Sequence, residues 1–207
     1  MDKIKLTKGE LKRQRDALLQ YLRYLPTLQL KKQQLQMEIL HQLSLLGERV
    51  QNENVRCLSC EAWAGLLRAD KNINISSWLK PKKVLVGLKN IAGVDLPVFE
   101  GVEFEAVDYD LFIYPLWVDS AIELLRKIVS LRQEIETIKK GIEILRQELR
   151  ITAQRVNLFE KVKIPEAEEA IRLIKIYLGD QMANAVGRSK IAKRKISEAT
   201  IYDAIAS

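Results

Sequence analysis

The clearest pattern in the chain is a seven-residue repeat of apolar residues in its last part. Two rows keep this spacing over more than four repeats, and Arg, Gln, Glu and Lys fill the positions between them. The rows are Ile128, Ile135, Ile142, Leu149, Val156 and Leu131, Ile138, Leu145, Thr152, Phe159. Such rows form the a and d positions of a coiled coil, although one long helix of an ordinary bundle is an open alternative. As seam residues we single out Ile128, Ile135, Ile138, Ile142, Leu145 and Leu149.

The first part of the chain repeats this pattern with an interruption. The apolar positions are Leu11, Leu18, Leu25, Ile39 and Leu46 in one row and Leu22, Leu43 and Val50 in the other. Between them, the positions due to be apolar hold Gln29, Lys32 and Gln36. Pro26 stands beside this interruption. Because proline lacks an N–H and its ring clashes with the preceding turn, we expect a bend there.

Start and turn signals complete the list of elements. The segments 7–10 and 120–123 fit capping boxes at the starts of the two helices. In the middle of the chain, segments 84–88 and 102–107 have strand-like composition, and Ala92-Gly93 between them is a turn signal. Pro97 favours a strand end or an edge strand. The middle therefore predicts a hairpin or a small meander.

These elements predict a mainly α fold. A long antiparallel two-helix coiled coil carries a small α/β head, with a β-hairpin, at its turn. The expected parts are a first coiled-coil helix over 1–70, a central head over 71–117, and a second helix with a short tail over 118–207. In this register the numbers of facing residues sum to about 188, so Pro26 lies opposite about residue 162. Pro165 is then one turn away.

The same register brings two basic clusters to one end of the coil. The chain has 34 Lys and Arg against 27 Asp and Glu, a net charge of +7 and a pI near 9.3. The residues proposed for this basic tip are Lys8, Lys12, Arg13, Arg15, Arg188, Lys190, Lys193 and Arg194. A charge run is often only a solvated face. Two runs at one end favour a contact surface for a partner.

Residues that carry chemistry are scarce. Cys57 and Cys60 form a C-x-x-C pair at the end of a long helix, without the βαβ context of a redox motif or a second pair for zinc. We interpret them as reduced thiols and His41 as a surface or seam residue. Glycine-rich phosphate loops do not occur in the sequence. We therefore expect no catalytic site, cofactor or metal. The charged N-terminus does not resemble a secretory signal, which predicts a cytoplasmic chain.

Four stretches of this sequence resemble the D subunit of the rotary V/A-type ATPases. They are LTKGELKRQRDALL near the start, PTLQLKKQQL at 26–35, GLKNIAGVDLPVFEGVEFE at 87–105 and TAQRVNLFEKVKIPEAEEAIRLIKIYL at 152–178. The most specific piece is the pattern RVNxxExxxIP from Arg155 to Pro165. Together the stretches cover most of the chain.

The resemblance implies the shaft of the central stalk. Such a D subunit stands inside the hexamer of catalytic A and B subunits, binds the F subunit along its side and rests on the C subunit, above the membrane ring. It would carry torque between ATP synthesis or hydrolysis and proton or sodium transport, as a non-catalytic subunit peripheral to the membrane. Two alternatives are a coiled-coil tether unconnected to an ATPase, which would homodimerise, and a nucleic-acid-binding coil with salt-dependent affinity.

Overall fold

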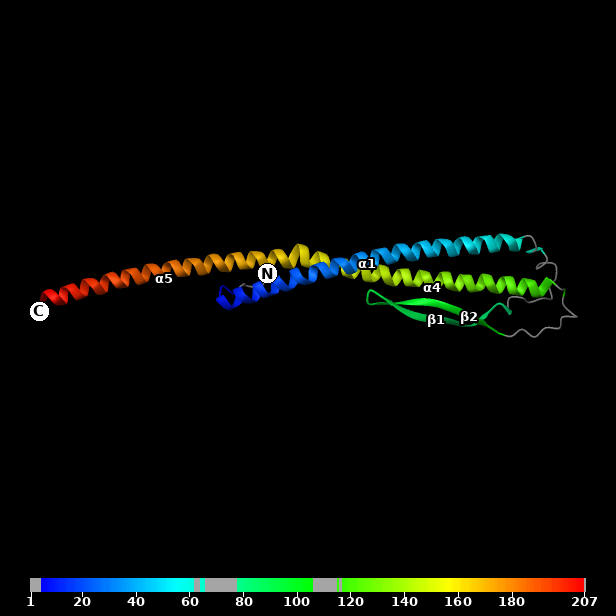
Figure 1. Ribbon diagram of the computed structural model, residues 1–207, viewed down its shortest axis with the longest axis horizontal. Helices are drawn as coiled ribbons and strands as arrows, with labels where there is room; N and C mark the ends of the chain where they lie inside the picture. Colours follow the sequence, from blue (N-terminus) through cyan, green and yellow to red (C-terminus); the bar gives the residue numbers. More distant parts are fainter. Residues whose placement is uncertain (1–4, 62–63, 66–77, 106–114, 116, 207) are drawn as a thin grey trace. The chain divides into compact units, whose positions relative to one another are not determined.

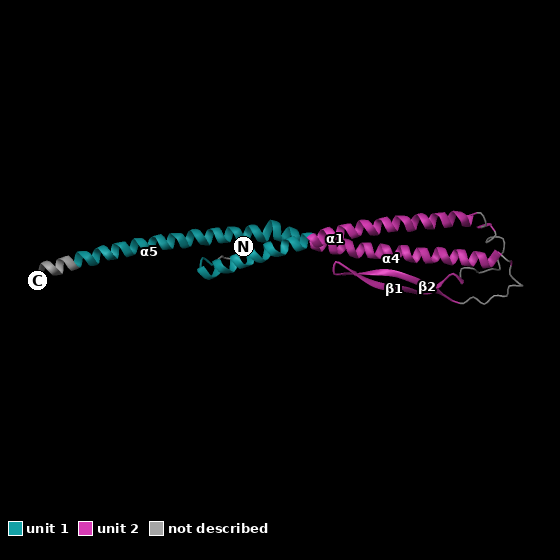
Figure 2. Cartoon of the chain, in the orientation of Figure 1, with its two compact units in different colours: residues 1–29, 154–207 teal, residues 30–153 magenta. Residues whose placement is uncertain are grey.

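The computed structural model describes residues 5–61, 64–65, 78–105, 115 and 117–206 (Figure 1). The elements are helix α1 (Lys8–Glu61), strands β1 (Pro81–Ile91) and β2 (Val94–Phe104), helix α4 (Trp117–Leu158), a π-helical turn η1 (Phe159–Lys163) and helix α5 (Ile164–Ala206). The fold is mainly helical with one antiparallel hairpin, as predicted. The chain forms two compact units, residues 1–29 with 154–207 and residues 30–153 (Figure 2).

In the unit of residues 30–153, α1 and α4 pair through a buried seam. Leu145 of α4 is fully buried in one cluster with Leu35 and Ile39 of α1. Of the residues singled out on α4, Leu149 is half-buried against this cluster, and the buried ones are Ile128, Ile135, Ile138, Ile142 and Leu145. These residues form an apolar stripe along α4. An isolated helix would leave the stripe in water, and burial of apolar surface is the main contribution to the stability of the fold.

Two ion pairs cross between the same helices. Arg49 Nε lies 2.8 Å from Glu134 Oε1, and Arg132 Nε lies 2.7 Å from Glu53 Oε1. The hydrogen bond from Arg132 to Glu53 raises the pKa of the guanidinium above its ordinary value. These side chains are only partly buried, so each pair adds little stability. They show which residues of the two helices face each other.

The N-terminal cap of α1 forms in part as predicted. Thr7 Oγ1 accepts a hydrogen bond from the Glu10 N–H at 3.2 Å, which satisfies one unpaired donor of the first turn. The Glu10 carboxylate accepts from Gln14 instead of completing the box. The second predicted box is wrong, because α4 begins three residues earlier than Ser120. Glu123 pairs with a lysine one turn along the helix.

Helix α1 continues through Pro26, so the proline does not end the helix. The predicted register is displaced. It placed Arg49 opposite about residue 139 and Tyr21 opposite about residue 167. Arg49 instead pairs with Glu134, and in the other unit the ring of Tyr21 stacks on Phe159. The register was derived from where the helices end, whereas packing side chains determine it.

The hairpin between the helices is longer than its predicted strands. The two strands pair from Pro81 opposite Phe104 to Ile91 opposite Val94, so the second strand starts eight residues before position 102. Ala92 and Gly93 have φ of 53° and 75°. Two left-handed residues in a two-residue loop match the twist of the flanking strands. The turn signal was therefore correct, and residues 106–107 of the predicted strand lie outside the described residues.

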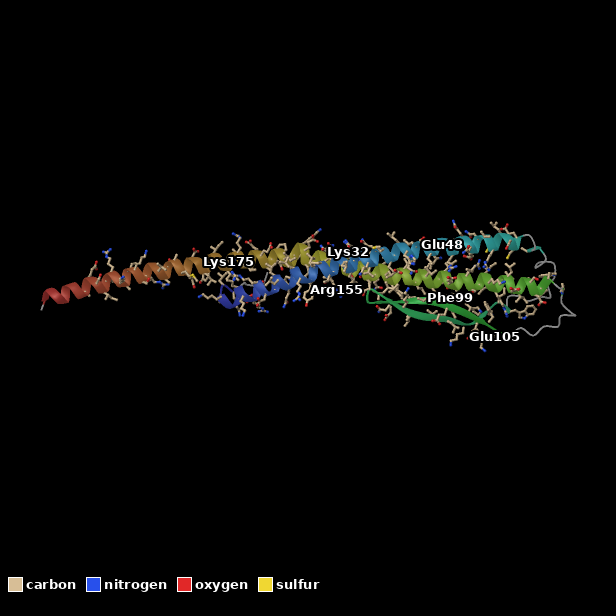
Figure 3. The ribbon with its side chains drawn as sticks, viewed as in Figure 1. Lys32, Glu48, Phe99, Glu105, Arg155 and Lys175 are labelled. Atoms are coloured by element: carbon tan, nitrogen blue, oxygen red, sulfur yellow. The ribbon has the colours of Figure 1, made fainter. Side chains whose placement is uncertain are left out.

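The hairpin packs along the helices at two places. At its turn, Val94 and Leu96 join the cluster of Leu35 and Leu145, so the hairpin covers the seam where the sequence predicted a polar gap. At its open end, the Arg126 guanidinium of α4 donates to the backbone oxygens of Trp78 at 3.2 Å and Glu105 at 2.8 Å. In the view of Figure 3, α4 lies between α1 and the hairpin.

The guanidinium of Arg126 also lies over the ring of Phe104, 5.0 Å from its centroid. This contact adds a cation–π attraction to the two hydrogen bonds. A single side chain of α4 thus holds the segments that enter and leave the hairpin. Because a two-stranded hairpin is marginally stable alone, this anchoring and the cluster at the turn keep it folded.

The seam is tested by two isoleucines on opposite sides of α4. Ile142 is 4% exposed and Ile144 is 37% exposed. Ile142→Asp places a carboxylate in the apolar seam and should lower the free energy of unfolding by about 3–5 kcal/mol. Ile144→Asp should change it by less than about 1 kcal/mol. Urea unfolding followed by circular dichroism measures both, and equal effects of the two substitutions would contradict the pairing of α4 with α1.

Candidate functional site

The two cysteines lie near the end of helix α1. Cys57 and Cys60 are free, half-buried and one turn apart on α1. Burial, and then the neighbouring Cys57, raise the pKa of the Cys60 thiol above its ordinary value, so less reactive thiolate is present near neutral pH. His41 is exposed. Among the described residues, no group of three or more His, Cys, Asp and Glu side chains could hold a metal ion.

The first basic cluster lies at the start of α1. We call Lys8, Lys12, Arg13 and Arg15 the N-terminal cluster, and all four side chains are exposed. In the part of the chain that the structure describes, none of the four forms an ion pair. Their charges are therefore available to a partner. The helix dipole disfavours cations in the first turn, so these residues do not contribute to helix stability through it.

The second basic cluster lies late in α5. We call Arg188, Lys190, Lys193 and Arg194 the C-terminal cluster, and these side chains are also exposed. Arg194 pairs with Glu198 on its own helix at 2.9 Å, and Arg188 donates to the backbone oxygen of Asn184. The late part of α5, orange in Figure 1, extends past the start of α1 within the same unit, which is teal in Figure 2. The structure therefore does not bring the two clusters into contact.

The late part of α5 is exposed on all sides. Its last buried residue is Ile174, and from 179 to 199 only Gly187 is even half-buried. Apolar side chains on this segment, such as Met182 and Ile196, are more than half exposed. A single helix of this length is marginal in water when it packs on nothing. Contact with a partner would stabilise it.

A third surface was missed in the sequence. On α1, within residues 30–61, a row of exposed apolar side chains lies opposite the seam. We call Leu30, Met37, Leu40, Val55 and Leu58 the outer row. At 100° per residue they fall within an arc of about 80°, on the side of the helix away from Leu35 and Ile39. Met37 and Leu40 are 71% and 67% exposed.

The other positions of this arc are mostly uncharged. They are Gln33, Ser44, Glu48 and Gln51. An exposed apolar stripe with few charges is the kind of helix face that receives another apolar helix or strand. The signal was present in the sequence as apolar residues on two faces of one helix. We assigned only one face, because the seven-residue rows account for a single seam.

The helices of the described part of the chain lack any stretch long and apolar enough to cross a bilayer.

Residues 10–194 match the sequence model of the family described as the D subunit of ATP synthase. The chain is 45% identical over 201 residues to the D subunit of the V-type ATP synthase of Borreliella burgdorferi, and the match covers 95% of this chain and 96% of that protein. It is 34% identical over 196 residues to the corresponding V-type ATP synthase D subunit of Chlamydia caviae, at 94% of each chain.

The raised pKa of Cys60 makes a prediction about thiol chemistry. Because the thiolate forms only at higher pH than in an ordinary cysteine, alkylation of Cys60 at pH 8 should be slower in the folded protein than in the chain unfolded in urea. Mass spectrometry after a timed reaction with iodoacetamide measures the rate. Cys57→Ser removes a source of the shift and should speed the reaction. Faster reaction in the folded parent than in the unfolded chain would show that the thiol is activated.

Proposed function

Because the chain belongs to the D-subunit family of V-type ATP synthases, we propose that it is the rotor shaft of the complex. In this role it transmits torque between ATP synthesis or hydrolysis in the A/B hexamer and ion movement through the membrane ring. The observation that carries the proposal is the pairing of α1 with α4 by a buried seam and two cross-helix ion pairs. The chain itself is a non-catalytic subunit, held at the membrane through its complex.

A shaft has to resist twisting, and paired helices do so better than a single helix. The packed layers around Leu145 and Ile142 oppose sliding of one helix past the other, because each side chain fills a gap on the partner helix. The shaft also has to act differently on three equivalent catalytic interfaces. Only contacts that differ between states shift a conformational equilibrium. An asymmetric shaft meets each interface with a different face.

The basic clusters support a contact with the A/B hexamer. Both clusters are exposed and lie on the unit of residues 1–29 with 154–207, away from the hairpin in sequence. Exposed charges act mainly by steering and by partner choice. The exposed late part of α5 would gain a packing partner inside a ring of other subunits. The hairpin, on the other unit, would then lie toward the C subunit.

The outer row of α1 supports a contact with the F subunit. It lies on the unit of residues 30–153, apart from the basic clusters in sequence and along the side of the helix. Apolar side chains spaced by seven and three residues, as in Leu30, Met37 and Leu40, fit the apolar face of a partner helix. Burial of Met37 and Leu40 by the F subunit would remove two of the most exposed apolar side chains of the described residues from water.

The basic clusters predict salt-dependent binding to the hexamer. Changing the N-terminal and C-terminal clusters to Glu together should weaken binding to purified A/B hexamer, and the difference from the parent should be larger at low salt, because salt screens exposed charges. Binding of the F subunit should hardly change. The control reverses Lys82, Lys83 and Lys89 of β1, which are also exposed. Loss of F binding with intact hexamer binding would contradict this assignment.

The outer row predicts the opposite selectivity. Met37→Glu with Leu40→Glu should weaken binding of the F subunit by about tenfold or more, because two buried contacts at an interface each contribute about 1 kcal/mol. Gln33→Glu with Ser44→Glu adds the same charge at polar positions of the same face and should have a smaller effect. Both pairs of substitutions are at exposed positions and should leave the melting temperature unchanged. Calorimetric titration with the purified F subunit measures the affinities.

A further inference from the structure

The π-helical turn η1 lies at a break in the backbone ladder of the second long helix. The Ile164 N–H donates to the oxygen of Phe159, five residues earlier, and the backbone is helical at both ends of the turn. The next residue is Pro165, which has no N–H and whose ring would clash with a carbonyl four residues earlier in a regular helix. A widened turn accommodates the proline. Two consecutive positions therefore lack the ordinary four-residue hydrogen bond.

The turn also changes the spacing of the buried residues. After the turn, positions of a buried row are seven apart, from half-buried Ile164 to buried Ile171 and from Ala167 to Ile174. Across it, the spacing is eight, from Val156 to Ile164 and from Phe159 to Ala167. All these residues belong to the unit of residues 1–29 with 154–207. One extra residue is therefore inserted in the repeat, and η1 is the place where the helix absorbs it.

An uninterrupted α-helix would bury the wrong residues. Continuing the two rows in steps of seven from Val156 and Phe159 leads to Lys163, Ala170 and Tyr177 in one row and to Glu166, Leu173 and Asp180 in the other, and of these six only Ala170 is buried. In the structure, Lys163 and Glu166 pair with each other on the surface, at 3.2 Å between nitrogen and oxygen. Burying such charges without partners would be costly. The apolar sequence after the turn thus fits the register with one extra residue.

The contact between Tyr21 and Phe159 fixes the start of the turn. Their rings stack with centroids 5.3 Å apart and an interplanar angle of 25°. Phe159 is the first residue of η1 and also the acceptor of its five-residue hydrogen bond. The wide turn is therefore anchored on α1 at one end and on the buried row of Ala167 and Ile171 at the other. Its middle residues, such as Val162, are exposed.

We propose that η1 and Pro165 form a register joint in the second long helix. The extra residue keeps the buried row of α5 in phase with α1, and the broken ladder makes this segment the first part of the paired helices to open. Long helices bend where the hydrogen-bond ladder is interrupted. The mechanical consequence rests on the proposed function: in a shaft, the joint is where α5 yields under load. The register and the local opening do not depend on that function.

The experiment compares three variants of the full chain. The straightened variant combines deletion of Val162 with Pro165→Ala, which removes the extra residue and restores the N–H. It should melt within about 4 °C of the parent or higher, because Ile164, Ala167, Ile171 and Ile174 then continue the seven-residue rows. Deletion of exposed Gln147 in α4 is the matched control and should lower the melting temperature by more than about 10 °C. Pro165→Ala alone should keep the π turn, because the buried row still requires the extra residue.

Hydrogen exchange measures the opening of the joint. In the parent, the amides of residues 160–168 should exchange at least about tenfold faster than those of the flanking helical turns, and in the straightened variant this difference should disappear. A straightened variant that unfolds as readily as the Gln147 deletion would overturn the register assignment. Equal exchange rates of the amides of residues 160–168 in the parent and in the straightened variant would contradict the proposal that this segment opens first.

The effect of the straightened variant on the proposed shaft function is measured in the assembled complex. The straightened variant should still bind the A/B hexamer and the F subunit, because the outer row and the basic clusters are unchanged. ATP hydrolysis by the reassembled complex should be at least about twofold slower than with the parent, since conformational steps limit many such turnovers. Unchanged hydrolysis would overturn the mechanical part of the proposal. Failure of the parent itself to bind the hexamer would instead contradict the proposed function.

Discussion

The apolar stripe of α4 has to be covered, and the fold of residues 30–153 depends on how this is done. A helix as long as α4 presents its stripe as a continuous strip, and no single loop can cover it. Helix α1 covers most of it in antiparallel orientation. Near Leu145 the facing segment of α1 is rich in Gln and Lys, and there the turn of the hairpin supplies Val94 and Leu96. The hairpin therefore completes the seam.

The sequence predicted the long helices and the hairpin because both have strong local signals. Seven-residue spacing and two left-handed turn residues depend on neighbours in the chain. It did not predict Leu35 as a core residue, because the contacts that bury this side chain come from Val94 and Leu96, about sixty residues away. The register was wrong for a related reason. Apolar rows are compatible with several registers, and the packing of Leu35 and Ile39 against Leu145 and the hairpin selects among them.

The candidate surfaces differed in how far sequence could locate them. Basic residues close in sequence are visible as clusters, although the sequence suggested that the two clusters meet, and α5 carries the second cluster past the start of α1. The sequence pattern did not identify the outer row, because the seven-residue rows account for only one apolar face of each helix. Exposure of Met37 and Leu40 identified it, and this exposure can be determined only once the seam residues are known.

The two helices of the pair differ on the sides that face away from the seam. On α4, at 100° per residue, the side away from both the seam and the hairpin holds exposed Glu136, Lys140 and Gln147, which suits direct contact with water. On α1 the corresponding positions form the apolar outer row. Exposed apolar rows promote association, so a surface of this kind is costly for a chain that stays alone. The asymmetry therefore favours a permanent neighbour on the side of α1, and solvent or only occasional contacts on the outer side of α4.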